Sequence, residues 1–232
     1  MSALAELLEL LHDAHGRLSS FEAEYRDWSQ PRPSRELVVD RSEIANGRFR
    51  GRWRGAGPWP TEIVATRRFW LQRPDRLRVE ELRNHRLVRL GIRDDAQWWR
   101  WDQVEGASSG KASMTGADAG TLPPLLSPPL LDPVRLVAGL RFEPAGVGER
   151  TGRKVLRARA RRRGQPSSCD RVSLELEFDA EHGTVLRRAG FEDGQCVQLT
   201  EALAVRYGPE IDPERFAFLS PDGKPAREIE AP

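Results

Sequence analysis

Apolar and polar residues repeat with two different periods along the chain. Over residues 3–26 leucines recur every three or four positions, at Leu4, Leu7, Leu8, Leu11 and Leu18, which predicts an amphipathic helix. Gly16 interrupts this pattern, so a break or a C-cap at that point stays open. From residue 36 onward the period is two, as in Arg48–Arg54, where Phe49 and Trp53 share one side and arginines take the other. That alternation is typical of half-buried strands.

Segments of this second kind follow one another with turn residues between them. They predict strands over 48–54, 62–71, 76–82, 87–92 and 97–101, and again over 154–161, 171–179, 183–191 and 195–207. Short strands at regular spacing indicate an all-β sandwich or barrel.

Two segments fall outside this pattern. Residues 105–120 are small and polar and predict a flexible loop. Residues 121–142 combine prolines with the pairs Leu125-Leu126 and Leu130-Leu131, and a short helix is expected from Pro133 to Leu140. A leucine left in water costs roughly 2 kcal/mol, so this segment must cover something. It is either a lid over a ligand site or a fixed plug of the core.

The bulk composition narrows the function classes. Of the 232 residues 38% are hydrophobic and 31% are charged, and the net charge is only +2, so we expect no nucleic-acid partner. No apolar run approaches the ~20 residues of a membrane span, so no stable membrane insertion is expected. Glu6 and Glu9 stand where the apolar part of an export signal would run. The sequence as it stands therefore predicts a cytoplasmic protein, and a cell-envelope protein if it is a trimmed piece.

No catalytic motif stands out. The chain contains no GxSxG, HExxH or P-loop sequence, and His12 and His15 have no further metal ligands nearby in the sequence. We expect no catalytic residue, no metal and no cofactor, and a non-catalytic protein is favoured over an enzyme.

Cys169 and Cys196 lack metal-ligand spacing, and both a disulfide and free thiols stay open. The run Arg157–Arg163 alternates arginine with alanine and is best explained as the solvated face of a strand.

Three segments, in this order, resemble a known family. The first is Phe69-Trp-Leu-Gln-Arg-Pro-Asp-Arg-Leu-Arg-Val-Glu80, the second runs from Leu87 to Trp101, and the third is Ile211-Asp-Pro-Glu-Arg-Phe-Ala-Phe218. With the N-terminal helix before them they resemble the lipoprotein-carrier-like superfamily, which has the LolA/LolB/RseB-like fold.

The resemblance implies a mainly β protein with accessory helices. Its antiparallel sheet would be strongly curved into an incomplete, half-open β-barrel, with an N-terminal helix and a lid or plug. The expected organisation is one domain over residues 1–225, with a loose tail at 226–232. Within it we expect the 3–26 helix, a first strand set at 36–104, the 105–120 loop, the 121–142 lid and a second strand set at 150–207.

The implied function is the non-catalytic binding of a hydrophobic ligand, such as a lipid or an acylated peptide, in the concave face. Two alternatives stay open: a small-molecule biosynthetic enzyme using the same cavity, and a regulatory protein-interaction module. The expected partners are a hydrophobic small molecule or acyl chain, together with a protein partner under the second alternative.

The candidate ligand-binding residues are aromatic and leucine side chains. Trp99 and Trp101 share one face of their strand, and Trp98 lies on the other. Each tryptophan has the alternative role of an ordinary core or arginine-stacking residue. The full candidate set is Trp53, Trp70, Trp99, Trp101, Leu126, Leu130, Leu131 and Leu136.

Overall fold

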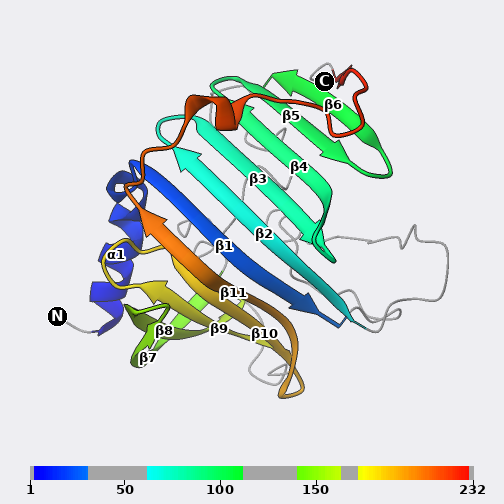
Figure 1. Ribbon diagram of the computed structural model, residues 1–232. Coiled ribbons are helices and arrows are strands. Elements are labelled where there is room, and N and C mark those ends of the chain that lie inside the picture. Colours follow the sequence, from blue (N-terminus) through cyan, green and yellow to red (C-terminus); the bar gives the residue numbers. More distant parts are fainter. Residues whose placement is uncertain (1–2, 31–61, 112–139, 163–171, 230–232) are drawn as a thin grey trace. The chain divides into compact units, whose positions relative to one another are not determined.

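A computed structural model describes residues 3–30, 62–111, 140–162 and 172–229. Its elements are, in order, α1 (Ala3–Arg17), β1 (Ser20–Ser29), β2 (Ile63–Gln72), β3 (Arg76–Arg83), β4 (Arg86–Asp94), β5 (Gln97–Asp102), β6 (Gly106–Lys111), β7 (Leu140–Arg150), β8 (Arg153–Arg162), β9 (Val172–Asp179), β10 (Val185–Glu192), β11 (Gln195–Tyr207), the 3₁₀ helix η3 (Pro213–Phe216) and β12 (Arg227–Glu228). Figure 1 shows them with the same labels.

The described strands belong to one sheet, in the order β12-β6-β5-β4-β3-β2-β1-β11-β10-β9-β8-β7. This order has two ends, so the described sheet is open and does not close into a barrel. The open order of the described strands confirms the prediction of a mainly β protein with an incomplete barrel. No described helix has both the length and the apolar character needed to cross a bilayer.

The N-terminal helix is shorter than predicted. It ends at Arg17, and residues 20–29 form β1 instead, so the prediction of helix over 3–26 is wrong for its last third. The cause is an ambiguous pattern. Leu18, Phe21 and Tyr25 are spaced by three and four residues, as in a helix, but Phe21, Ala23 and Tyr25 also alternate, and all are buried. Pairing with β2 and β11 decides in favour of the strand.

The chain divides into two compact units. The first contains α1, β7 to β10 and parts of β1, β2 and β11. Its core combines the inner side of α1, at Leu7, Leu11 and Ala14, with strand residues such as Leu176 and Phe178. Gly183 illustrates the fit: its φ is +71°, and a Cβ there would lie 2.7 Å from the Cβ of Ala14. Glycine is therefore required at this turn for two reasons: the positive φ and the lack of room for a Cβ.

The second unit contains β3 to β6, η3, β12 and the remaining parts of β1, β2 and β11. Its strands β2 to β6 pair antiparallel in sequence order. The C-terminal segment, drawn in orange and red in Figure 1, leaves β11 and runs alongside β3 to β5 to reach β6. Whether the two units make one domain, as the sequence predicts, stays a prediction.

Three segments differ from the sequence-based expectation. Residues 106–111, expected in a loop, form β6, because pairing with β5 outweighs the weak strand propensity of small polar residues. Residues 140–150 form β7, with a bulge between Pro144 and Val147 that breaks the alternation. Residues 227 and 228 of the expected loose tail pair with β6. The alternation of Arg157–Arg161 is confirmed, with Ala158 and Ala160 buried.

Candidate ligand-binding face

The register of β2 to β6 divides the side chains of the second unit between two faces. One cross-strand row runs through Trp70, Arg78, Ile92 and Trp99; we call this side the tryptophan face. On the opposite side a row runs through Arg67, Glu81, Arg89 and Asp102; we call it the cluster face.

The tryptophan face is covered by the chain's own C-terminal segment. Trp70 packs with Ile211 and Phe216, and the guanidinium of Arg215 lies 4.9 Å from the centre of its ring. Its indole Nε1 donates to Glu22 at 3.1 Å. Trp70 is therefore satisfied by contacts within the protein.

Trp99 and Trp101 lie on the same face, and the predicted sharing of one side is confirmed by their register. Trp101 packs with Leu90 and Ile92, and the ring of Phe218 stacks on Trp99 with centroids 6.2 Å apart. These contacts correspond to the role of an ordinary core residue, which the sequence left open as an alternative for each tryptophan.

The other sequence-predicted site residues cannot be placed in this way. Trp53, Leu126, Leu130, Leu131 and Leu136 lie outside the described residues. Ligand contact by any member of the candidate set, including Trp70, Trp99 and Trp101, stays a prediction.

The cluster face carries a buried carboxylate that the sequence analysis did not single out. The Glu81 side chain is 3% exposed and meets three guanidinium groups. Arg83 donates to its Oε1 from Nη2 at 2.9 Å and from Nε at 3.2 Å. Arg89 Nη1 reaches Oε2 at 3.5 Å, and Arg67 Nε lies 3.7 Å from the same oxygen.

These arginines keep Glu81 ionised. Burial by itself would raise the pKa of its carboxyl, but the positive charges of Arg67, Arg89 and Arg83 outweigh burial, and the pKa lies below its ordinary value. The pKa of Arg89 is raised in turn, since the charge of Glu81 and the hydrogen bond to Asp102 outweigh its own desolvation. The ion cluster is therefore fixed in its charged form.

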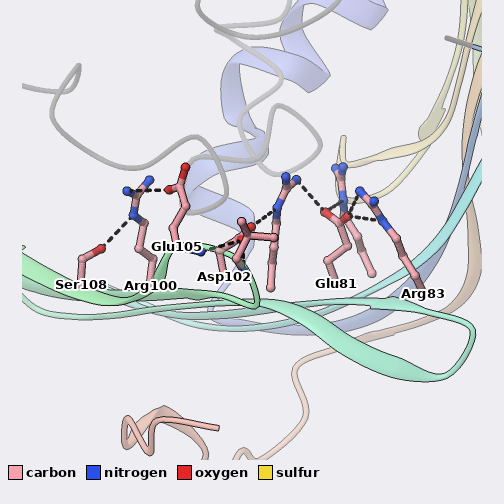
Figure 2. A network of polar contacts seen from close by, with 9 residues as sticks. Glu81, Arg83, Arg100, Asp102, Glu105 and Ser108 are labelled. Atoms are coloured by element: carbon pink, nitrogen blue, oxygen red, sulfur yellow. Dashed lines mark hydrogen bonds and ion pairs between the residues drawn. The ribbon is translucent and has the colours of Figure 1, made fainter. Parts of the chain in front are cut away.

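The network extends across β5 to β6. Arg89 Nε donates to Asp102 Oδ2 at 2.9 Å, and Asp102 Oδ1 accepts the backbone N–H of Val104 at 2.8 Å. Arg100 donates to the hydroxyl of Ser108 at 2.9 Å and to Glu105 at 3.3 Å. Figure 2 shows the labelled side chains of this network, those of Glu81, Arg83, Arg100, Asp102, Glu105 and Ser108, on one side of the strands.

The arginines around Glu81 are held in place by their ion pairs with its carboxylate, and their side chains stay partly exposed to water. Their side chains are 36% exposed for Arg67, 35% for Arg83 and 48% for Arg89. These three guanidinium groups face the two carboxylates of Glu81 and Asp102. Such an arrangement suits a carboxylate or phosphate, which arginine binds through paired N–H groups.

Away from this charged row the cluster face becomes apolar on β2 and β3. The next cross-strand row holds Phe69 and Val79, and the one after it Leu71 and Leu77. All four side chains are buried. Along β2 and β3 the side chains of this face thus change from charged to apolar, with about 7 Å between successive rows.

One signal in the sequence points to this cluster. Leu77, Val79 and Glu81 occupy alternate positions of one strand, so their side chains point to the same side of the sheet, and Glu81 brings a charge to that side. A carboxylate among buried side chains requires hydrogen-bonding or positively charged partners. The sequence does not say which of its many arginines supply them, because they come from three strands.

A second polar cluster lies in the first unit. Ligand atoms of Asp179, Glu181 and His182 fall within 4.8 Å of one another. Arg153 already pairs with Asp179 and reaches Glu181 at 2.9 Å. Asp179 also accepts the turn amides of Glu181 and His182 at 3.0 and 2.8 Å. Burial alone would raise the pKa of Asp179, but these hydrogen bonds lower it. The cluster closes the turn between β9 and β10.

Solved structures share this architecture. A chain of the Pseudomonas aeruginosa MucA/MucB complex matches with a TM-score of 0.56 and 16% identity, over 94% of this chain and 61% of that one. A crystal structure of MucB matches at 0.55 and 16%, over 92% and 62%. This chain therefore spans about three fifths of the length of those proteins. An uncharacterised conserved protein from Thermus thermophilus matches at 0.52 and 10%, over 99% and 100%.

The chain has a LolA/LolB/RseB-like fold. At this low identity the likeness shows the fold alone, and the fold fits the binding of a ligand or of a protein. No protein-family model matches the sequence, and no curated protein matches it at a significant level.

Proposed function

We propose that this protein binds, without catalysis, a hydrophobic ligand that carries an acidic group, such as a fatty acid or an alkyl phosphate. The acidic group pairs with Arg83 and Arg89 beside Arg67 on the cluster face. The apolar part of the ligand lies along the same face of the sheet. A lipid and an acylated peptide both meet this description.

The observation that carries the proposal is the geometry around Glu81. One buried carboxylate orients guanidinium groups from three neighbouring strands, and these groups stay partly exposed. Because the arginines are already ordered, an incoming anion immobilises few side chains, which favours binding. Each charge-assisted hydrogen bond that it gains contributes roughly 1.5–3 kcal/mol.

Two further points support the hydrophobic part. The rows next to the cluster hold Phe69, Val79, Leu71 and Leu77 on the same face. On the tryptophan face the chain's own Phe216 and Phe218 already pack against the indoles. The cluster face keeps Arg67, Arg83 and Arg89 partly exposed, so it is the better candidate for an acidic group among the described strands.

The test compares ligands of one chain length with different head groups. Dodecanoate, dodecyl phosphate and neutral dodecyl maltoside are titrated below their micelle concentrations by calorimetry. The two anionic ligands are expected to bind at least about tenfold more tightly than the neutral one, corresponding to one charge-assisted hydrogen bond.

Matched variants locate the effect. Arg83→Gln combined with Arg89→Gln should weaken the anionic ligands about tenfold or more and leave the neutral ligand nearly unchanged. Arg68→Gln is the control, since Arg68 is also ion-paired and half-exposed but lies on the tryptophan face. Equal binding of all three ligands, or equal losses in the control, would contradict the proposal.

A further inference from the structure

Among the described residues, the chain's own tail pairs with only part of the outer edge of β6. β6 has six residues, and β12 pairs with two of them, placing Arg227 opposite Ser108 and Glu228 opposite Ser109 in parallel. One further hydrogen bond joins Ile229 N–H to the carbonyl of Ser109 at 2.8 Å. A strand edge that remains open is a template for pairing with another chain.

The tail that covers this edge is weakly held. Beyond Phe218, which packs under Trp99, none of the residues up to Ile229 is buried, and Leu219 is 81% exposed. Segments with so little buried surface separate from their neighbours at low cost in free energy.

The tail places a second arginine in the cross-strand row of Arg100. Arg227 lies opposite Ser108, which in turn lies opposite Arg100. Neighbouring strands are about 4.8 Å apart, so Arg227 and Arg100 lie two strand spacings apart in one cross-strand row. Arg100 also donates to Ser108 at 2.9 Å and to Glu105 at 3.3 Å. A strand with an acidic residue at the position of Arg227 would place a carboxylate in the row of Arg100.

Two residues further along the edge, the next row on the same side of the sheet contains an indole N–H donor. Trp98 lies opposite Gly110 of β6, and a Cβ on that glycine would be 2.6 Å from an indole carbon and 3.1 Å from Nε1. The Trp98 side chain is 5% exposed, and within the described ranges no group accepts from its Nε1. A strand that extends past Ser109 carries a side chain into this row, where an acidic group would accept that hydrogen bond.

We propose that the outer edge of β6 docks an extended segment of a partner protein with acidic residues at alternate positions, and that residues 227–229 hold this place until the partner displaces them. Two acidic side chains on one side of the segment serve Arg100 and Trp98, and small apolar residues alternate with them. This inference is independent of the ligand proposed for the Glu81 cluster.

The test uses blocked synthetic heptapeptides and calorimetry on the full chain. The first peptide alternates valine with glutamate, the second alternates valine with lysine, and the third is the glutamate peptide with alternate backbone nitrogens methylated. Ile229→Pro removes the N–H that bonds to Ser109, and Ile229→Ala is the matched variant that keeps it.

The glutamate peptide is expected to bind saturably, and about three- to tenfold more tightly to Ile229→Pro than to the unaltered chain or to Ile229→Ala, the range given by one net hydrogen bond. The lysine peptide should bind at least about tenfold more weakly, and methylation should abolish binding. Binding of the methylated peptide, equal binding of the glutamate and lysine peptides, or equal affinity of the two Ile229 variants would overturn the proposal.

Discussion

Replacing Glu81 with glutamine tests the central ion cluster. The change keeps the size of the side chain but removes the charge that holds three guanidinium groups together. Breaking a fully buried ion pair costs roughly 3–5 kcal/mol. Because these arginines are between 35% and 48% exposed, water offsets part of the loss, and we expect Glu81→Gln to lower the free energy of unfolding by about 2–3 kcal/mol. The melting temperature should then fall by roughly 4–12 °C.

The effect should also depend on pH with a definite sign. The pKa of Glu81 is lower in the folded chain than its ordinary value of 4.5. Its contribution to stability is therefore fully present above about pH 4.5 and is lost as the pH falls through the folded pKa. The difference between wild type and Glu81→Gln should be constant near neutral pH and shrink in acid.

Urea unfolding followed by tryptophan emission, repeated from about pH 7 to about pH 3, measures both quantities across the range in which the carboxyl titrates. Glu24→Gln is the matched control, since Glu24 pairs with Arg68 at 2.9 Å but is 37% exposed, and its loss should cost less than about 1 kcal/mol. The reasoning is refuted if the two variants are equally stable at neutral pH, or if the Glu81→Gln difference does not shrink in acid.

Three further predictions concern other parts of the chain. Phe216→Ala should cost about 3–5 kcal/mol and shift tryptophan emission, because Phe216 is 2% exposed and packs on Trp70; an unchanged unfolding midpoint would exclude this packing. Gly183→Ala should destabilise the chain by about 1–3 kcal/mol more than Gly152→Ala, since both glycines have positive φ but only Gly183 has a neighbour within 4 Å; equal losses in thermal melts would show that the contact is loose. Cys196 is a free thiol, so Cys196→Ser under reducing conditions should change stability by no more than about 0.5 kcal/mol, and a larger loss would indicate tight burial of its sulfur.

The sequence predicted most strands of the second unit because their residues alternate clearly. Arg76–Arg83 is a half-buried strand in which alternating side chains are buried, whereas in Gln97–Asp102 the buried residues Trp98 and Trp101 lie on opposite faces. The same alternation correctly placed Trp99 and Trp101 on one side. It did not show that the C-terminal segment covers that side, since Phe216 and Phe218 reach it only through the tertiary fold.

The errors arose where local patterns were ambiguous or absent. Phe21 and Tyr25 fit both a helix and a strand, and pairing with neighbouring strands decides between them. β6 has no apolar pattern and is a strand because β5 offers it hydrogen bonds. The arginine cluster joins residues from β2, β3 and β4, and strand register cannot be read from single-residue types.

The most direct measurement of the proposed function follows the arginine side chains themselves. In a ¹H–¹⁵N spectrum of the arginine Nε–H groups, dodecyl phosphate should shift the signals of Arg83 and Arg89 saturably and leave that of Arg68 in place. Dodecyl maltoside at the same concentrations should move none of the three. Shifts confined to Arg68, or no shift of Arg83 and Arg89 while the ligand binds, would contradict the account.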